Sequence, residues 1–422
     1  MDRPLNILIA ALGSDGDVHP FIRMAIQLRS RGHDVRLFAP AMYQSLAESL
    51  EIAFVPMGTR EQFDRVTANP DLWRPTRAFG VAARAAAEFL EPVYRAIVEH
   101  DQPGRTVLVM STLVLGGRVA QEKLKIPAAM VHLSPAVFRS AIAPARTPPL
   151  PVAAWLPPWL NRAIYAVVDR MVIDPALTGP LNALRATLGL PPVTGILRDW
   201  IHSPDLTIGL FPAWFAPAAP DWPRHTLLTG FPLYDEADVT PIDPQLGRFL
   251  DEVPAPIAFT PGSAMRHAAG FFAAAMDVCD RLNARGVFVT RHAANVPDGL
   301  SGKFHHVAFA PFSRLLPRCA ALVHHGGIGT SAQGLAARIP QLVMPMAHDQ
   351  FDNAHRLQRL GVAAVLPAGR FTARRAVAKL RQLLGAPDVA RSCAAMKARM
   401  KEQNPFEKTV QAIEKLGDHI PG

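Results

Sequence analysis

The sequence predicts an α/β protein with two doubly wound, Rossmann-like domains, and three observations carry this prediction. The chain has 422 residues, of which 49% are hydrophobic and 19% charged, which is enough for two hydrophobic cores. An apolar strand, a glycine-broken turn, an amphipathic helix and a second strand follow one another near the N-terminus. The same order recurs near the middle of the chain. Because open parallel sheets bind ligands beyond the carboxyl ends of their strands, we expect the active site in a cleft between the two domains.

Two repeats of this plan can be placed on the sequence. The first is expected as strand 6–12, turn 13–17, helix 20–30 and strand 34–38. The second is expected as strand 257–260, turn 261–263, helix 271–284 and strand 287–290. The first strand is too short to cross a membrane and no cleavage region follows it, so we expect neither an anchor nor a signal peptide.

Proline-rich stretches set the expected domain limits. The chain has 40 prolines, which cluster in 144–158 and 212–256 and indicate loops and a linker. We expect an N-terminal domain over 1–215, a linker over 216–254, a C-terminal domain over 255–400 and a final helix within 401–422.

Charge and cysteine usage limit the expected partners and the expected cellular compartment. The net charge of +9 comes from scattered arginines without a run of like charges, which argues against a nucleic-acid partner. A basic surface suits an anionic small molecule or the inner face of a membrane, although solvated surface charge remains the favoured explanation. The three cysteines have no CxxC spacing, so we expect reduced thiols, no disulfides and a cytoplasmic protein.

Residues 324–330, His-His-Gly-Gly-Ile-Gly-Thr, form the most informative motif. A strand ending at Val323 would deliver both histidines into a turn whose glycines let backbone N–H groups approach an anion. Thr330 would then open a helix, whose N-terminus carries free donors and a positive dipole. An ordinary strand-to-helix turn is the alternative. A metal site built on the paired histidines is disfavoured because neighbouring cysteine and acidic ligands are missing.

A second polar group follows the next apolar strand, expected over 341–346. Asp349 and Gln350 offer a carboxylate and an amide, which suit hydroxyl groups. A phosphate-binding turn beside a polyol-binding pair predicts a nucleotide-sugar site.

The block over 309–361 resembles the donor-site signature of family 1 glycosyltransferases. The resemblance implies the two-domain GT-B fold, with acceptor binding in 1–215, donor binding in 255–400 and a C-terminal helix that returns to the N-terminal domain. It further implies that His325 donates to a phosphate oxygen, that Ser263 reaches the second phosphate and that no metal is bound. The remaining diphosphate donors would be Gly327, Gly329 and Thr330.

The turn over 13–20 resembles the Gly-Ser-x-Gly-Asp-Val-x-Pro motif of glycopeptide and sterol glycosyltransferases. In that motif the aspartate before valine is the general base, which corresponds to Asp17. His19 is the second choice for the base, and a helix cap is the alternative role of Asp17. Strand 107–112 has no carboxylate, so Asp17 would act without the dyad partner found in plant enzymes.

Two further donor contacts follow from the same resemblance. Phe309 occupies the position of a base-stacking tryptophan, and Phe312 replaces the glutamine expected near uridine, which weakens the case for a UDP donor. Core packing is the alternative role of both phenylalanines. Asp349 and Gln350 match the Asp-Gln pair that contacts the donor sugar, and His348 lies beside them.

Six segments resemble the rhamnosyltransferases of bacterial rhamnolipid biosynthesis. They are 71–73, 202–204, 211–217, 221–223, 229–233 and 347–353. This closer likeness implies inverting transfer of L-rhamnose from dTDP-L-rhamnose to a 3-(3-hydroxyalkanoyloxy)alkanoate, with no other cofactor.

Three other functions compete with rhamnosyl transfer. One is glucosyl transfer from a UDP- or dTDP-sugar to a sterol or other lipophilic molecule, and another is a non-catalytic nucleotide-sugar-binding subunit. A nicotinamide oxidoreductase is disfavoured because the first turn lacks the GxGxxG pattern and carries two aspartates.

The acceptor side is the least specified part of the sequence. Phe21, Trp73 and Trp155 are the aromatic candidates for contact with an amphiphilic acceptor. The apolar, proline-rich run over 144–172 predicts a buried insertion or, alternatively, an acceptor wall or membrane-touching edge. The enzyme that makes the acceptor and the inner membrane surface are the remaining candidate partners, the latter for a peripheral protein.

Overall fold

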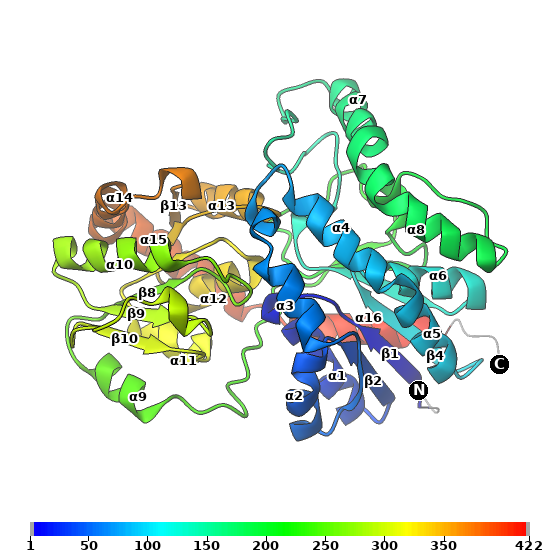
Figure 1. Cartoon of the computed structure of the whole chain (residues 1–422), viewed down its shortest axis with the longest axis horizontal. Coiled ribbons are helices and arrows are strands. Elements are labelled where there is room, and N and C mark those ends of the chain that lie inside the picture. The colour runs from blue at the N-terminus through cyan, green and yellow to red at the C-terminus, as the bar shows by residue number, and fades with distance from the viewer. Residues whose placement is uncertain (1–3, 419–422) are drawn as a thin grey trace. The chain divides into compact units, whose positions relative to one another are not determined.

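The computed structural model describes residues 4–418, and the chain divides into two compact units (Figure 1). Unit 1 runs up to Pro232 and takes up the chain again from Asn404, whereas unit 2 spans Leu233–Gln403. The boundary after Pro232 falls inside the stretch expected as a linker. The first part of that stretch is not a linker, because Thr226–Leu228 forms a strand of the unit 1 sheet.

Unit 1 is built on a seven-stranded parallel sheet with strand order β3-β2-β1-β4-β5-β6-β7. Its strands are β1 (Asn6–Ala10), β2 (Asp34–Ala39), β3 (Ala53–Pro56), β4 (Thr106–Ser111), β5 (Ala128–His132), β6 (Leu206–Gly209) and β7 (Thr226–Leu228). Its α-helices are α1 (Asp15–Ser30), α2 (Gln44–Ser49), α3 (Arg60–Ala68), α4 (Ala78–Glu88), α5 (Leu90–His100), α6 (Leu115–Leu124), α7 (Pro158–Val168), α8 (Asp174–Thr187) and α16 (Pro405–Gly417).

Alternation along the central strands gives the sheet of unit 1 two apolar faces. Leu8 and Leu108 lie in one core cluster with Ile97 of α5, whereas Ile7 and Ile9, also fully buried, point to the opposite face. On that second side α16 contacts β4 and β5 and packs along α1. Helices therefore cover both faces, as a buried parallel sheet requires.

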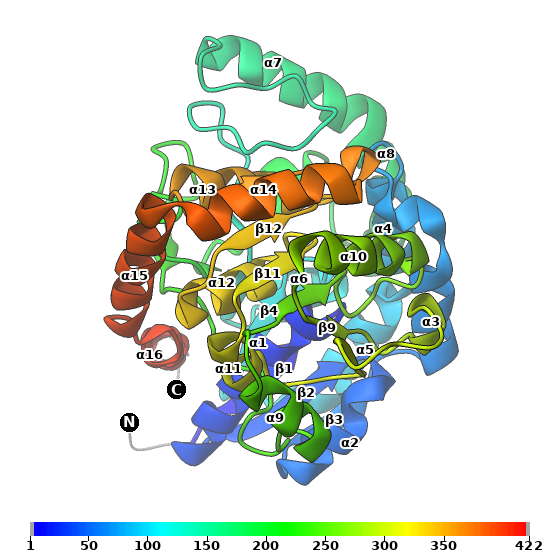
Figure 2. The ribbon, with the colours of Figure 1, turned by 90° about the vertical axis from the view of Figure 1, so that its left-hand side faces the viewer.

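Unit 2 repeats the plan with a six-stranded parallel sheet of order β10-β9-β8-β11-β12-β13. Its strands are β8 (Ile257–Thr260), β9 (Gly286–Val289), β10 (Phe304–Val307), β11 (Ala321–His324), β12 (Gln341–Val343) and β13 (Ala363–Val365). Its α-helices are α9 (Pro244–Asp251), α10 (Ala269–Leu282), α11 (Phe312–Leu315), α12 (Ile328–Ala337), α13 (Gln350–Arg359), α14 (Ala373–Gly385) and α15 (Pro387–Lys401). Helices α10 and α14 pack side by side, and α12 packs against α15 (Figure 2).

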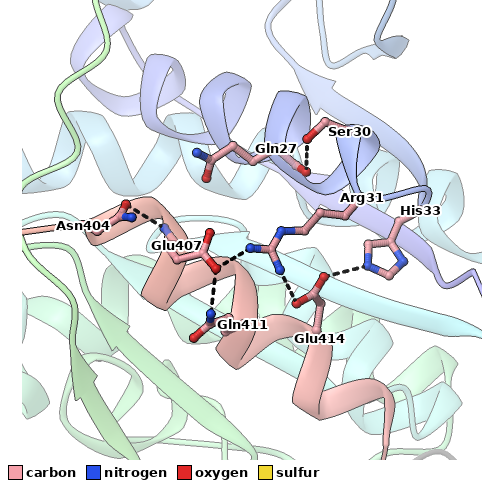
Figure 3. Close-up of polar contacts among 8 residues, drawn as sticks. All are labelled: Gln27, Ser30, Arg31, His33, Asn404, Glu407, Gln411 and Glu414. Atoms are coloured by element: carbon pink, nitrogen blue, oxygen red, sulfur yellow. Dashed lines mark hydrogen bonds and ion pairs between the residues drawn. The ribbon is translucent and has the colours of Figure 1, made fainter. Parts of the chain in front are cut away.

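The helix α16 is held on unit 1 by a cluster of charged groups (Figure 3). The Arg31 guanidinium lies 2.5 Å from a Glu407 carboxylate oxygen and 2.9 Å from one of Glu414. The imidazole of His33 lies 3.1 Å from the other Glu414 oxygen. The hydrogen bond to Glu407 raises the pKa of Arg31, and the same bond lowers the pKa of the Glu407 carboxyl. The segment that follows α1 thus meets α16 in one ion-pair network.

Candidate active site

The turn after β1 places a carboxylate at the start of α1. The helix begins at Asp15 rather than at Pro20, because Ser14 is its N-cap and Asp17 occupies the third helical position. The Asp17 Oδ2 atom accepts the backbone N–H of Ser14 at 2.8 Å and its hydroxyl at 3.1 Å. These bonds fix the orientation of the Asp17 carboxylate and show its capping role, which does not exclude the general-base role expected from the sequence.

Gly13 is required next to this carboxylate. Its φ is 133°, and a Cβ atom there would lie 2.4 Å from Asp17 Oδ2. The backbone N–H of Leu12 donates to the Ser111 hydroxyl at 3.2 Å, which ties the turn to the end of β4. The turn therefore has one backbone path, and only glycine fits at its start.

The other polar side chains of this turn point elsewhere. Asp15 accepts the Tyr43 hydroxyl at 2.9 Å. His19 is 6% exposed, and its ring lies edge-on to Tyr43 with the ring centroids 6.2 Å apart. His19 is therefore a weaker candidate for the general base than Asp17, because a base must reach the acceptor hydroxyl and the His19 ring is buried.

The sequence did not predict a buried histidine pair formed by His132, at the end of β5, and His202, which follows the π-helical turn Ile196–Trp200. The Thr112 hydroxyl lies 2.9 Å from His132 Nδ1, and His132 Nε2 lies 3.0 Å from His202 Nδ1. Burial holds the pKa of His132 well below its usual range and lowers the pKa of His202 to about 4, so both rings are neutral near pH 7. The only signal in the sequence was a histidine at the end of an apolar strand.

In unit 2 the His325 ring is enclosed by glycines from two turns. A Cβ on Gly262, after β8, would lie 2.9 Å from this ring, and a Cβ on Gly327, after β11, would lie 2.4 Å from His325 Nε2. Because β8 and β11 are neighbours, both turns meet at the carboxyl edge of the sheet. The close approach explains why these two positions need glycine.

The two adjacent histidines have different environments. His324 is the last residue of β11 and is fully buried, so the expected strand end at Val323 is one residue early. Its Nδ1 accepts the Gly326 N–H at 3.1 Å, and burial lowers its pKa to about 3. Burial, with a smaller contribution from His348, lowers the pKa of half-buried His325 to about 4. His325 is therefore a neutral imidazole that can donate one N–H.

The helix after this turn starts two residues earlier than expected. Gly327 is the N-cap of α12, which places Gly329 and Thr330 in its first turn. The Ser331 N–H is the first to find an intrahelical acceptor, the Gly327 carbonyl at 2.9 Å. The N–H groups before it point toward the carboxyl edge of the sheet with no helical partner, as an anion site requires. Ser263 lies partly exposed in the neighbouring turn.

The residues expected at the donor sugar lie at the start of α13. Asp349 is its N-cap, and its Oδ2 accepts the side-chain amide of Asn353 at 2.8 Å. The same amide donates to the Gly326 carbonyl at 3.0 Å, which links this helix to the glycine turn. His348 is exposed in a left-handed conformation with φ of 56°.

Gln350 is less accessible than the sequence suggested. It is 3% exposed, and its Oε1 accepts the backbone N–H groups of Met346 at 2.8 Å and Ala347 at 3.1 Å. Its amide oxygen therefore shapes the loop, and only its NH₂ group could serve a sugar hydroxyl.

The two phenylalanines expected at the nucleobase separate in the structure. Phe312 opens α11 and packs against the core cluster that includes Leu315, which favours its core role. Phe309 is partly exposed, and the guanidinium of Arg291 lies 5.5 Å from its ring centroid. Of the two phenylalanines, Phe309 therefore remains the candidate for contact with the nucleobase.

The three aromatic candidates for the acceptor have different exposures. Phe21 is completely buried on the inner face of α1, so its assignment to an acceptor surface is wrong. Trp73, at the end of a short 3₁₀ turn, is partly buried. Trp155 is 82% exposed, and its neighbour Trp159 is 66% exposed, so the run over 144–172 is not the buried insertion expected.

Metal-binding clusters and membrane-spanning helices are both absent from residues 4–418. No group of three or more His, Cys, Asp or Glu side chains there is placed to hold a metal ion. No helix in that part of the chain is long and apolar enough to cross a membrane.

Family models match both units of the chain. The C-terminal domain of erythromycin biosynthesis protein CIII-like proteins matches residues 282–416. The N-terminal domain of glycosyltransferase family 28 matches residues 7–143. The C-terminal match includes the turn after β11, with Gly327, and the N-terminal match includes the turn after β1, with Gly13.

Solved glycosyltransferases share the fold. The glycosyltransferase of kitacinnamycin superposes with a TM-score of 0.73 at 22% identity, over 99% of this chain and 100% of that one. The spinosyn rhamnosyltransferase SpnG complexed with thymidine diphosphate gives 0.66 at 17% identity, over 97% and 100%. The fold is therefore that of the GT-B glycosyltransferases, with two Rossmann-like parallel sheets, as the sequence predicted.

Sequence relatives give the family. An uncharacterized glycosyltransferase of Mycobacterium leprae is 30% identical over 98% of this chain and 97% of its own length. The O-mycaminosyltylonolide 6-deoxyallosyltransferase of Streptomyces fradiae is 28% identical over 99% and 100%. The vancomycin aglycone glucosyltransferase of Amycolatopsis orientalis is 27% identical over 85% of each protein. This chain therefore belongs to the same family of glycosyltransferases.

Proposed function

We propose that the protein is a metal-independent, inverting glycosyltransferase that moves L-rhamnose from dTDP-L-rhamnose to the hydroxyl of a 3-(3-hydroxyalkanoyloxy)alkanoate. The observation that carries the donor half is the glycine-enclosed His325 beside the open N-terminus of α12. This arrangement offers a neutral imidazole N–H, backbone N–H groups and the Thr330 hydroxyl to a diphosphate.

In the proposed reaction, the turn after β1 removes a proton from the acceptor, and the turn after β11 stabilises the negative charge of the leaving diphosphate. The acceptor oxygen forms a bond to the anomeric carbon of the sugar while the bond from that carbon to the diphosphate oxygen breaks. Asp17 takes the acceptor proton, and dTDP leaves with the electron pair of the broken bond. Donors from Ser263 and from the α12 turn stabilise the charge that develops on the leaving diphosphate, which is why no metal is needed.

Three observations support a thymidine and deoxyhexose donor. Phe309 is partly exposed with the Arg291 guanidinium over its ring, and Phe312 provides no amide for uridine. The Streptomyces fradiae relative is by name a 6-deoxyallosyltransferase. Asp349 and the NH₂ group of Gln350, with His348 beside them, supply the sugar contacts in this proposal.

The identity of the acceptor is a separate part of the proposal. It rests on the likeness of segments such as 211–217 and 347–353 to the rhamnolipid enzymes and on the net charge of +9, which suits an anionic amphiphile. Trp73 remains the candidate for contact with its alkyl chain.

A cytoplasmic setting is also proposed. The three cysteines are buried, and burial raises the pKa of Cys279 and Cys319 to about 12 and that of Cys393 to about 11. Protonated, buried thiols of this kind are inert and suit a reducing compartment.

Glucosyl transfer from a UDP-sugar to a lipophilic acceptor is the second candidate, because the Amycolatopsis relative is by name a glucosyltransferase. A non-catalytic nucleotide-sugar-binding subunit is the third. It is disfavoured because Asp17 and the residues of the donor turn are both intact in this sequence.

The test combines donor binding with product analysis. Thermal shift with dTDP and UDP at matched concentrations should show larger stabilisation by dTDP, since a ligand at about a hundred times its Kd adds roughly 2.7 kcal/mol. Mass spectrometry of reactions with dTDP-L-rhamnose and a hydroxyalkanoyloxy-alkanoate should then show one added deoxyhexose. Stronger stabilisation by UDP with a hexose adduct would replace this proposal by the glucosyl alternative. Donor binding without any product would favour the non-catalytic subunit.

A further inference from the structure

Helix α7 and the π-helical turn after it, Asp169–Ile173, have an inverted amphipathic pattern. Asn161, Tyr165 and Asp169, four residues apart, are buried at 0%, 6% and 3% exposure. The outward face between them carries large apolar side chains instead. They are Trp159, Val167, Met171 and Val172, with exposures of 66%, 61%, 69% and 51%. In the structure α7 projects from unit 1 beyond α8 (Figures 1 and 2).

The buried polar side chains explain how α7 is attached. The Asn161 amide donates to the backbone carbonyls of Ala141 and Ala153, both at 2.9 Å. Asp169 pairs with Arg139, whose guanidinium lies 4.8 Å from the centroid of the Tyr165 ring. Attachment of α7 to unit 1 therefore does not use its outward apolar face.

The exposed apolar residues are concentrated in this region. Of the eleven large apolar side chains exposed within residues 4–418, six lie between 142 and 172. We name these six, together with the two exposed arginines of α7 and the π-helical turn, the α7 patch. Its members are Ile142, Trp155, Trp159, Arg162, Val167, Arg170, Met171 and Val172.

Charge on the α7 patch has one sign. Arg162 and Arg170 are both exposed, and each follows an exposed apolar residue, Trp159 or Val167, by about one helical turn. Asp169 is the single acidic residue between 141 and 173, and it is buried in its pair with Arg139. A second copy of this protein would bring arginine against arginine, so self-association through the patch is opposed by charge.

We infer that the α7 patch docks on the surface of a bilayer containing anionic phospholipid. Trp155 and Trp159 would lie at the boundary between headgroups and acyl chains, where indole rings are favoured, and the two arginines would contact headgroup phosphates. Docking of this kind needs no membrane-spanning helix. Membrane docking does not depend on the proposed transfer reaction. If the acceptor is lipid-like, docking would bring the enzyme to the membrane into which the acceptor partitions.

Vesicle flotation of the full-length protein tests the inference. The protein should float with phosphatidylcholine vesicles that contain phosphatidylglycerol and much less with phosphatidylcholine alone. Trp155→Ser with Trp159→Ser should lower the partition coefficient roughly tenfold or more, because two exposed indoles lose their apolar contact. Arg162→Gln with Arg170→Gln should lower it about thirtyfold on anionic vesicles only, at about 1 kcal/mol per arginine.

Matched control variants lie in unit 2. Val253→Ser with Leu384→Ser removes exposed apolar side chains outside the patch, and Arg248→Gln with Arg374→Gln removes the same charge. All variants alter exposed side chains, so thermal melts should match wild type and the control pairs should float like wild type.

Three outcomes would overturn the inference. The first is equal flotation of wild type and the tryptophan variant. The second is a loss of oligomer mass in that variant without any vesicle binding by wild type. The third is unchanged flotation with a raised KM for a short soluble acceptor, which would make the patch an acceptor wall. None of these readings depends on which sugar is transferred, so failure here is distinguishable from failure of the proposed function.

Discussion

The turn after β1 in unit 1 and the turn after β11 in unit 2 each join a strand to a helix. The two turns differ in the charge of the side chains at the start of the helix. After β1 the helix N-terminus is capped by its own side chains, Ser14 and Asp17. After β11 the N-cap is Gly327, which has no side chain, and the nearest polar group is the neutral His325. One turn therefore holds a negative charge of its own, whereas the other leaves its N–H groups to an external anion.

In the proposed reaction, this difference gives each of the two turns its role. A carboxylate at the helix start repels a diphosphate but can take a proton from a hydroxyl. An uncapped helix start with glycines offers N–H donors to a diphosphate but has no carboxylate to act as a base. The same fold element therefore supports either half of a transfer reaction, depending on one or two side chains.

Among the variants that leave the polar side chains of both turns in place, the largest effect is expected from Gly13→Ala. The added Cβ would meet Asp17 Oδ2 at 2.4 Å in a backbone conformation with φ of 133°, so the carboxylate must move. We expect transfer to fall roughly a hundredfold, since displaced catalytic groups commonly cost this much. Gly16→Ala in the same turn is the control, because its Cβ meets nothing within 4 Å. Equal activities of the two variants would show that the position of Asp17 does not matter.

Gly327→Ala tests the other turn. Its Cβ would lie 2.4 Å from His325 Nε2, so the imidazole must leave its place between the glycines. We expect the Kd for dTDP, measured by calorimetry, to rise roughly tenfold, about the value of one charge-assisted hydrogen bond. Gly270→Ala, which has open space around its Cβ, should leave the Kd unchanged. An unchanged Kd in Gly327→Ala would remove His325 from the donor site.

His324→Asn addresses the pH dependence of unit 2. The unfolded chain protonates this imidazole below pH about 6.5, whereas the folded pKa is about 3. Stability of the wild type should therefore fall as the pH drops below about 6.5, with a slope near 1.4 kcal/mol per pH unit from this group. Asparagine keeps an acceptor for the Gly326 N–H and does not titrate. The melting-temperature gap between wild type and variant should narrow on acidification, and a constant gap would contradict the assignment.

The smallest effect is expected from Glu414→Gln in α16. This change removes the carboxylate that pairs with Arg31 and His33, and the Glu414 side chain is 12% exposed (Figure 3). We expect a loss of about 1 kcal/mol, in the range of partly exposed ion pairs, seen as a lower melting temperature of unit 1. Donor binding should not change. A shift in the Kd for dTDP would show that α16 affects donor binding as well as the packing of unit 1.

Local patterns predicted much of the fold and of the donor turn. The strand over 257–260 and the glycines beside His325 were readable because strand periodicity and turn chemistry are local. The early start of α1 was missed, because the helix was expected to begin at Pro20, although Ser14 and Asp17 have the spacing of a capping box.

Long-range features were not predictable in this way. Thr112, His132 and His202 come together from three separate segments, and no spacing rule joins them. The strand Thr226–Leu228 is only three residues long and lies among prolines, so composition predicts a linker there. The burial of Phe21 and the exposure of Trp159 depend on which face of a helix packs, and apolar composition alone does not reveal that face.

The central claim is that Asp17 supplies the base and the α12 turn binds the diphosphate. Asp17→Asn keeps the size of the side chain and an acceptor for the Ser14 N–H, so the turn should stay folded. The measurement is kcat for sugar transfer together with the Kd for dTDP in the same preparation. The account predicts a fall in kcat of about 10²- to 10⁴-fold with an unchanged Kd. Transfer at a near wild-type rate with unchanged donor binding would contradict it.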